Sequence, residues 1–262
     1  MPQGLNMWRA LLAGALLALG LAAQADCSDG RLPHETDARL KVTRVFDGDT
    51  VQLEDGRRLR LIGINTPELG HGRGPDEPVA RAARDEVERL LGKGDAPLLL
   101  EYGEDTYDHY GRLLAHAFLP DGRSLQVLLL RKGLAAAVTV PPNLRHAECY
   151  FASEAAARKA KRGVWKVAAL GPVKARRLPL DARGFRILRG TVTGVSRQRR
   201  ATRLSLDGRV DLLIYHDERR NFTQAPEALK GRRVEVRGWL SGGKGRRPRM
   251  RLRHGNNLRV LD

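Results

Sequence analysis

Short segments in which apolar and polar residues alternate, separated by Asp-Gly turns, recur along most of this chain of 262 residues. The first lies at 39–46 and is rich in β-branched residues. The next two, at 50–53 and 58–64, flank the Asp55-Gly56 turn. A period of two residues is typical of β-strands, and Asp-Gly between two such segments favours a hairpin. The folded part of the chain is therefore predicted to open with three β-strands.

Two more strands and three helices are predicted in the following hundred residues, because apolar residues recur there at strand or helical spacing. In chain order these are a helix at 79–91, strands at 97–102 and 112–119, and helices at 124–133 and 153–163. Ser153 is the expected start of the last helix, and Gly163 its end. The order predicts a small closed barrel of five strands with helices packed against it.

The last third of the chain repeats the strand pattern without an obvious sequence repeat. A basic stretch at 171–183 is predicted to be a linker. Short strands at regular spacing follow it, at 185–195, 201–206, 209–215, 232–240 and 249–253, with a helical turn at 225–230. We predict an α+β chain of two domains, a barrel with helices at 26–170 and a second small OB-like β-barrel at 184–262. Phe185 and Tyr215 are expected in the core of the second barrel.

The formal charge of +17 is distributed unevenly between these two predicted domains. Residues 26–170 contain 22 Lys and Arg against 22 Asp and Glu, whereas residues 171–262 contain 24 against 8. Such asymmetry indicates a polyanionic partner for the second domain. The alternative is that these charges form an ordinary solvated surface.

One strand of the basic domain has a pattern that suits an extended nucleic acid strand. In a strand over 249–253, Met250 and Leu252 face inward, so that Arg249, Arg251 and Arg253 share the outer face. On the strand over 232–240, Trp239 lies on the outer face with Glu235 and Arg237. An exposed indole can stack with a base of any sequence. We therefore predict that Trp239 and the three arginines contact nucleic acid.

The N-terminal 25 residues have the features of a cleaved signal peptide. An apolar run at 11–23 precedes Ala23-Gln24-Ala25, a small-x-small cleavage pattern, and is too short for a stable membrane-spanning helix. We expect export to the periplasm or the medium, with no stable membrane association after cleavage. In an oxidising compartment Cys27 and Cys149 are expected to form a disulfide; two unpaired thiols are the alternative.

Three polar fragments stand in a fixed order within the first domain. They are Asp47-Gly48-Asp49-Thr50, then Arg60 followed by Asn65-Thr66-Pro67-Glu68, and then Asp108-His109-Tyr110-Gly111-Arg112. Arg60 lies in an otherwise apolar strand, where a guanidinium requires a carboxylate or an anionic ligand. Carboxylates for a hard cation together with two arginines suit the cleavage of a phosphodiester, whose transition state gathers negative charge.

These fragments, with Gly133-Leu134-Ala135 and Gly163-Val164-Trp165, resemble the staphylococcal nuclease-like (thermonuclease) family over residues 40–165. The resemblance implies a five-stranded OB-type barrel with three helices and calcium-dependent cleavage of DNA and RNA. It further implies a role for each matching residue: Asp49, Asn65 and the Thr66 carbonyl bind Ca²⁺, Glu68 activates or orients the attacking water, Arg60 and Arg112 bind phosphate, and Asp108 and Tyr110 line the nucleotide pocket.

Two positions depart from the family pattern. Asn65 stands where the family usually has aspartate, so that one formal charge is missing and weaker calcium binding is expected. Residues 135–142 lack the tyrosines that contact the nucleotide in the family prototype.

We expect a monomeric, exported, calcium-dependent nuclease whose basic domain captures nucleic acid. The alternatives are a weak or inactive nuclease fold that only binds nucleic acid, and an envelope protein that binds acidic glycans.

Overall fold

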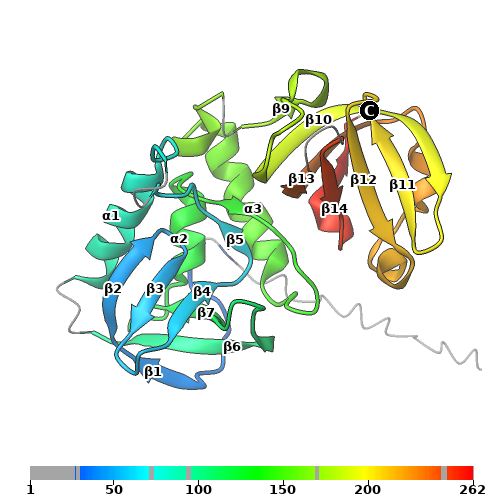
Figure 1. Cartoon of the computed structure of the whole chain (residues 1–262). Coiled ribbons are helices and arrows are strands. Elements are labelled where there is room, and N and C mark those ends of the chain that lie inside the picture. The colour runs from blue at the N-terminus through cyan, green and yellow to red at the C-terminus, as the bar shows by residue number, and fades with distance from the viewer. Residues whose placement is uncertain are drawn as a thin grey trace, which may run out of the picture.

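The computed structural model describes residues 27, 30–70, 74–92, 96–168, 171–242 and 247–261. The predicted signal peptide, 1–25, lies outside the described residues. Within the described ranges, no helix is both long and apolar enough to cross a membrane. Two β-rich domains lie side by side, with α3 on the side of the first domain that faces the second (Figure 1).

The first domain is built around a curved six-stranded sheet with the order β1-β6-β7-β4-β3-β2. Its strands are β1 (Ala38–Leu40), β2 (Val42–Asp47), β3 (Thr50–Leu53), β4 (Arg58–Leu61), β6 (Leu98–Tyr107) and β7 (Leu113–Phe118). A separate short pair joins β5 (Ile64–Asn65) to β8 (Ala136–Ala137). The helices are α1 (Ala80–Leu91), α2 (Leu125–Arg131) and α3 (Ala147–Lys159), with a 3₁₀ turn η1 at Gly163–Trp165.

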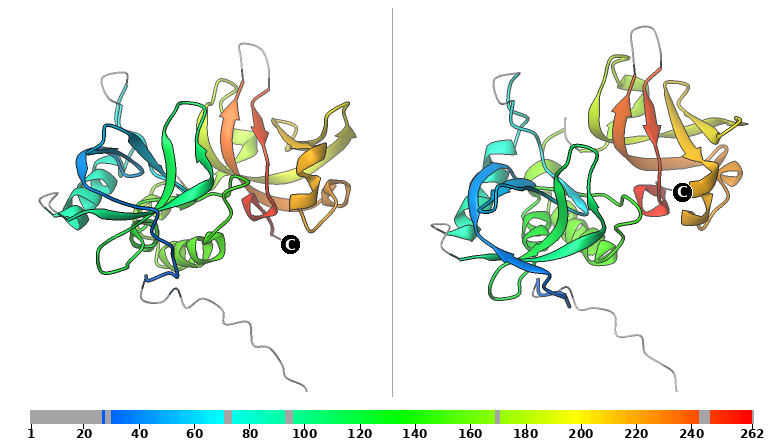
Figure 2. Two further views of the ribbon diagram at one scale, coloured as in Figure 1. Left: turned by 90° about the horizontal axis from the view of Figure 1, so that it is seen from below. Right: turned by 60° about the horizontal axis from the view of Figure 1, so that its bottom comes forward.

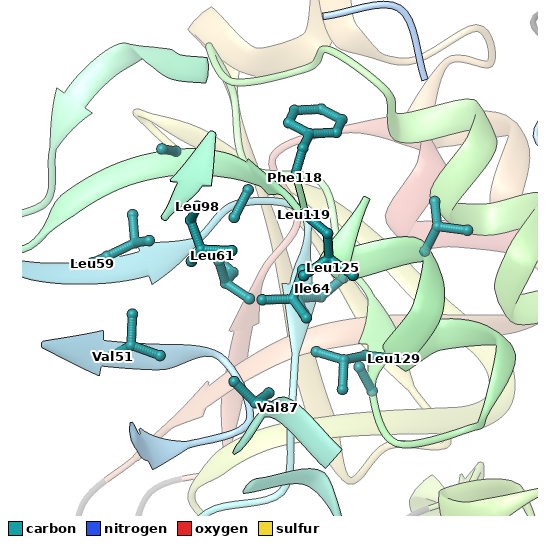
Figure 3. Packing of buried hydrophobic residues seen from close by; sticks show 14 of the residues in the cluster. Val51, Leu59, Leu61, Ile64, Val87, Leu98, Phe118, Leu119, Leu125 and Leu129 are labelled. Atoms are coloured by element: carbon teal, nitrogen blue, oxygen red, sulfur yellow. The ribbon is translucent and has the colours of Figure 1, made fainter. Parts of the chain in front are cut away.

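Leucine and valine side chains from the sheet and from α1 and α2 form one continuous core (Figure 3). Val51, Leu59 and Leu61 of the sheet belong to the same cluster as Val87 of α1 and Leu129 of α2. The alternation of the strands and the helical spacing at 79–91 thus supply the two apolar faces that meet. The predicted α+β class with helices packed on the sheet is confirmed for this domain. The sheet that the described residues form, however, has six strands and its two end strands, β1 and β2, do not pair, so that it is a half-barrel and not the closed five-stranded barrel that was predicted.

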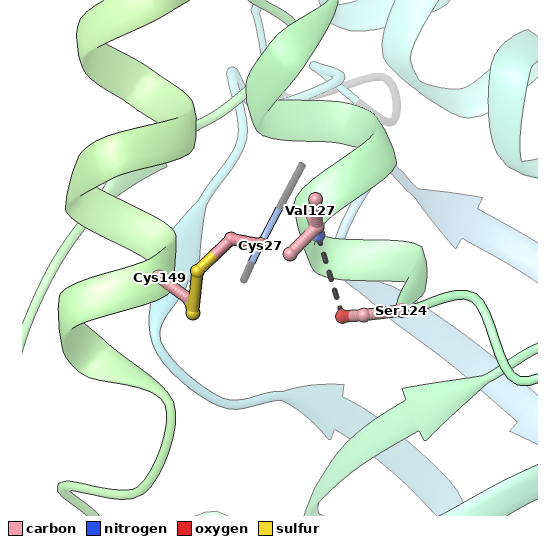
Figure 4. The surroundings of a disulfide bond; sticks show 4 residues. All are labelled: Cys27, Ser124, Val127 and Cys149. Atoms are coloured by element: carbon pink, nitrogen blue, oxygen red, sulfur yellow. Dashed lines mark hydrogen bonds between the residues drawn. A yellow bond between two sulfur atoms is a disulfide. The ribbon is translucent and has the colours of Figure 1, made fainter. Parts of the chain in front are cut away.

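The third helix begins earlier than the sequence predicts. α3 starts at Ala147, and Ser153, expected as its N-cap, is buried in the middle of the helix. The earlier turns contain Cys149, which forms the predicted disulfide with Cys27 across 122 residues of sequence (Figure 4). They also bury Tyr150 completely. Burial of these two side chains extends the helix beyond what its capping pattern indicates.

The second domain is a closed barrel, because β13 pairs with β10 in addition to its neighbours in the sheet. Its strands are β9 (Val173–Lys174), β10 (Gly184–Arg197), β11 (Ala201–Leu206), β12 (Val210–Tyr215), β13 (Arg233–Ser241), β14 (Arg249–Arg251) and β15 (Leu258–Val260). Short 3₁₀ turns are η2 (Ala175–Arg177), η3 (His216–Asn221), η4 (Pro226–Leu229) and η5 (Gly255–Asn257). The predicted second small barrel is therefore present (Figure 2).

The edges of the second domain differ from the sequence prediction. Ala175 and Leu178, inside the stretch predicted as a linker, are buried in the second core, and β9 pairs with β10. Phe185 and Tyr215, expected in that core, are partly exposed on the outside of the barrel. Arg251 covers the Tyr215 ring at 4.4 Å from its centroid. The prediction that Phe185 and Tyr215 lie in the core is therefore wrong. Both are near the end of a strand, where the alternation of apolar and polar residues stops and no longer indicates which side chains point inward.

A network of charged side chains holds the two domains together. Glu235 of β13 is buried and accepts hydrogen bonds from Arg158 of α3 and from Arg189 of β10. Arg237, two residues further along β13, donates to Glu154 of α3 at 2.6 Å and to the Ala137 carbonyl at 2.9 Å. Glu235 and Arg237 lie on the face of β13 that was predicted to point outward. The first domain covers both of these side chains.

Candidate functional site

Asp49 lies in the two-residue turn that joins β2 to β3, at the centre of a buried hydrogen-bond cluster. Its Oδ2 atom accepts from the Thr66 amide at 2.7 Å and lies 3.1 Å from Nη2 of Arg60. Its Oδ1 atom accepts from the Thr50 hydroxyl at 3.1 Å. The turn fits closely against Thr66 and α1, since a Cβ at position 48 would come within 2.7 Å of the Thr66 side chain. Glycine at position 48 therefore allows the Asp-Gly-Asp turn to approach Thr66, which directly follows β5.

Arg60 connects this turn to the segment that follows β4. Its Nη1 atom donates to the carbonyls of Leu61 and Ile64 at 2.7 and 3.0 Å. Its Nη2 atom reaches Oδ1 of Asn65 at 3.3 Å as well as Asp49. The Asn65 amide nitrogen in turn donates to the Thr66 carbonyl at 3.0 Å. The structure thus brings together Asp49, Arg60, Asn65 and Thr66, which the sequence analysis assigned to a single site.

Two further carboxylates act on this cluster electrostatically. Asp47 is buried and accepts from the Asp49 amide at 3.1 Å. Burial, reinforced by the charges of Asp49 and Glu68, raises the pKa of Asp47 to about 8. Glu68 is exposed at the rim, yet partial desolvation of its carboxyl and the Asp49 charge raise its pKa too, against the opposite effect of Arg60. Such mutual effects indicate a concentration of negative charge that favours a cation.

Glu77 supports Glu68 through the backbone. The Glu68 amide donates to Oε2 of Glu77 at 3.0 Å, and the Glu77 amide donates back to the Glu68 carbonyl at 2.9 Å. The sequence analysis did not identify Glu77, because no spacing rule links it to Glu68 across the segment between them. Asp47 was visible in the sequence as the first carboxylate of the Asp-Gly-Asp turn, but it received no role.

The third fragment forms a compact turn between β6 and β7. Asp108 accepts from Nε of Arg112 at 2.8 Å and from the amides of Tyr110 and Arg112. The Tyr110 ring is 73% exposed and lies 5.4 Å from the Arg112 guanidinium carbon. The charge of Arg112 acts on Glu68 and favours its ionised form. Arg112 is thus near the cluster, whereas Asp108 is occupied in shaping the turn.

Residues 58–167 match the family model described as "Staphylococcal nuclease homologue". The thermonuclease of Staphylococcus hyicus is 34% identical over 138 residues, which are 51% of this chain and 79% of that protein. The chain belongs to the staphylococcal nuclease-like family. The thermonuclease of Staphylococcus intermedius is 35% identical over 128 residues, 48% of this chain and 74% of the relative. The endonuclease YncB of Bacillus subtilis is 30% identical over 141 residues, 51% of this chain and 66% of the relative.

This membership confirms two predictions: the family itself and the enzyme class, a phosphodiester-cleaving nuclease. The matched region lies in the first domain and includes Arg60, Asn65, Glu68 and Arg112. The basic barrel after residue 170 lies outside the family model.

The oxygen donors of the cluster fit the chemistry of a hard cation. Asp49, the Asn65 amide oxygen and the Thr66 carbonyl lie within one hydrogen-bond network, and calcium prefers such carboxylate, amide and carbonyl ligands. In the described part of the chain, no group of three or more His, Cys, Asp and Glu side chains is arranged as a metal site. A site at this position therefore depends on the amide and carbonyl oxygens as well as on carboxylates.

The residues predicted to bind nucleic acid in the second domain have different surroundings. Arg251 and Arg253 both contact Oε1 of Glu218, at 2.8 and 2.9 Å. Arg249 is exposed, and the Trp239 side chain is 45% exposed at the edge of the docked face. The three arginines do not join the Asp49 cluster. The alternation of the three arginines was visible in the sequence. Glu218, the partner of Arg251 and Arg253, lies on another element, and its role was not visible.

Proposed function

We propose that the chain is an exported, calcium-dependent nuclease that hydrolyses phosphodiester bonds of DNA, RNA or both, and that its basic barrel captures the substrate. The observation that carries this proposal is the buried network joining Asp49, Arg60, Asn65 and Thr66 beside Glu68. The Cys27–Cys149 disulfide supports export, because such bonds persist in oxidising compartments.

In this mechanism Glu68 is the base. Its raised pKa lies closer to neutrality than that of an ordinary glutamate, which suits acceptance of a proton from water. The water oxygen bonds to phosphorus as one of its protons moves to Glu68, the opposite P–O bond breaks in line, and the leaving oxygen takes up a proton from solvent. A calcium ion held by Asp49, Asn65 and the Thr66 carbonyl would neutralise charge on the phosphate oxygens.

The two arginines stabilise the same developing charge. Arg112 already has a carboxylate partner in Asp108, so that it offers the phosphate its remaining donors. Both Nη groups of Arg60 are occupied by the protein, and Nη2 must leave Asn65 or Asp49 before it binds phosphate. A bidentate guanidinium fits a phosphate better than an ammonium does.

The proposal is tested by a calcium titration of cleavage. The protein should degrade single-stranded DNA or RNA with calcium and stop when a chelator is added. Glu68→Gln is the matched inactive variant, because its side chain is exposed and its substitution leaves the core intact. Absence of calcium-dependent cleavage with retained binding of nucleic acid would overturn the enzymatic proposal and favour a binding module.

A further inference from the structure

The face of the second barrel that docks on the first domain continues beyond the contact. Glu235 and Arg237 of β13 are buried at the junction, and Trp239 is the next residue on the same face. Phe185 of β10 lies opposite Trp239 in the strand register, with ring centroids 5.3 Å apart. An aromatic pair therefore borders the junction, next to the buried ion pairs that Glu235 and Arg237 make with α3.

A pocket between the two domains is lined by residues from both the candidate site and the aromatic pair. From the first domain it is lined by Asn65, Pro67 and Glu77, and from the second by Phe185 and Arg186. Asn65 also accepts from Arg60 in the cluster. The pocket thus begins at a residue of the candidate active site and ends at Phe185, one ring of the aromatic pair.

Arg186 brings a positive charge to this pocket. Its Nη1 atom donates to the Phe185 carbonyl at 2.6 Å and lies 3.5 Å from Oε1 of Glu77. The Arg186 side chain is 30% exposed, and its ion contact with Glu77 is long. The other oxygen of Glu77 accepts from the Glu68 amide. The Arg186 guanidinium is therefore only partly paired. It contacts Glu77, which in turn binds the backbone amide of Glu68, the proposed base.

We propose that this junction is a nucleic acid subsite, in which Arg186 binds a phosphate and the half-exposed Trp239, held edge-to-face by Phe185, stacks with a base of the strand being cut. It rests on the proposed function, because the strand must also occupy the Asp49 cluster. The chemistry is that of a single-stranded polynucleotide: a cation for the backbone next to aromatic surfaces for unpaired bases. The second barrel then contributes to the active site as well as to capture.

Binding to the subsite can be measured without cleavage. In residues 26–262 carrying Trp165→Phe, Trp239 is the sole tryptophan, so that a base stacking on it quenches the fluorescence. With chelator present, a hexadeoxythymidine should give a saturable quench. Arg186→Gln should raise the half-saturating concentration at least tenfold.

Arg199→Gln is the matched control, because it removes the same charge from the turn that follows the opposite end of β10, before the start of β11. It should change the half-saturating concentration less than twofold. Absence of a quench, or equal effects of the two arginine substitutions, would overturn the proposal.

Cleavage of substrates of different length provides the second test. Trp239→Ala should lower kcat/KM for a hexanucleotide roughly tenfold, as expected for one lost stacking contact. It should leave cleavage of a dinucleotide within twofold, because a dinucleotide spans only the bond that is cut. Equal effects on both lengths, or no effect on either, would count against the subsite. If the unmodified protein cuts neither substrate, the proposed nuclease function fails, and the fluorescence experiment still decides the subsite.

Discussion

Asn65 is hydrogen-bonded both to a proposed phosphate-binding residue, Arg60, and to a proposed calcium ligand, the Thr66 carbonyl. Its amide oxygen accepts from Arg60, and its amide nitrogen donates to the Thr66 carbonyl. Two of the three proposed calcium ligands are therefore hydrogen-bonded to each other. An aspartate at this position could accept from Arg60 in the same way, but it would leave the Thr66 carbonyl without this donor.

Asn65→Asp should tighten calcium binding, because it adds a carboxylate to a site that now has few. We expect the calcium concentration for half-maximal cleavage to fall roughly tenfold, since affinity of such sites follows the number of charged ligands. Asn256→Asp adds the same charge outside the site and should leave that concentration unchanged. An unaltered calcium midpoint in Asn65→Asp would remove residue 65 from the metal site.

Arg60→Lys should lower turnover by about 100-fold or more, the usual effect of removing one donor to a transition-state oxyanion. A lysine cannot reproduce the contacts of two Nη groups. Arg58→Lys, on the same strand but exposed, is the control and should retain near-normal turnover. Thermal melting of both variants separates loss of chemistry from loss of structure. A rate within fivefold of normal for Arg60→Lys would contradict its assigned role.

Among the secondary-structure elements, the short link from β4 to β5 determines where Asn65 lies. Gly63 in this link has φ +80°, and its carbonyl accepts from the Val138 amide at 2.9 Å. A Cβ at this position would come within 2.5 Å of the buried Tyr150 ring of α3. The third helix therefore presses directly against the backbone that leads into the site.

Gly63→Ala should destabilise the protein by about 2–4 kcal/mol, the sum of a left-handed backbone penalty and an overpacked core. Gly56→Ala measures the backbone penalty alone, because Gly56 has φ +86° but no atom lies within 4 Å of the position that a Cβ would take. It should cost about 1 kcal/mol. Urea denaturation midpoints measure both. Equal midpoints for the two variants would show that Tyr150 moves away without cost.

For the whole molecule, the buried ion pairs between the domains decide how the second barrel is oriented. Glu235 contacts Arg158 across the junction and Arg189 and Arg259 within its own barrel. Burial alone would raise the pKa of Glu235, but the hydrogen bonds from Arg158 and Arg189 outweigh it and lower the pKa to about 2. The carboxylate therefore stays charged at any ordinary pH.

Because the pKa of Glu235 is lowered in the folded protein, the junction should lose stability at low pH. Because the folded-state pKa of Glu235 lies below its ordinary value of 4.5, its contribution is complete above pH 4.5 and is lost as the pH falls through about 2. At pH 7, Glu235→Gln should lower the free energy of unfolding by roughly 3–5 kcal/mol, as expected when one partner of a buried pair is removed. The difference from the unmodified protein should shrink as the pH approaches 2.

Glu227→Gln is the control for this experiment. Glu227 pairs with Arg219 on the surface, where its side chain is 49% exposed. Exposed pairs typically contribute less than about 1 kcal/mol, so that this variant should stay close to the unmodified protein. Urea midpoints from pH 7 to pH 2 provide the measurement. A Glu235→Gln variant as stable as Glu227→Gln at pH 7 would show that the junction does not depend on this pair.

The sequence alone determined the strands and most helices, the division of charge, the disulfide and the members of the Asp49 cluster. Strand alternation, Asp-Gly turns and an ordered set of motifs are local properties, so that each can be recognised before the chain folds. Helix α3 was misplaced at its start, because burial of Cys149 and Tyr150 outweighed the local capping signal at Ser153.

Only the tertiary structure decided what each outer face touches. Trp239 was correctly placed on one face with Glu235 and Arg237, but nothing local shows that α3 covers two of these residues and leaves the third half-exposed. The same holds for Glu77 and Arg186, which come from separate domains and meet at a pocket that neither forms alone. Contacts between distant segments depend on which surfaces are buried against each other. Neither the spacing of apolar residues nor a short motif in the sequence predicts which surfaces these are.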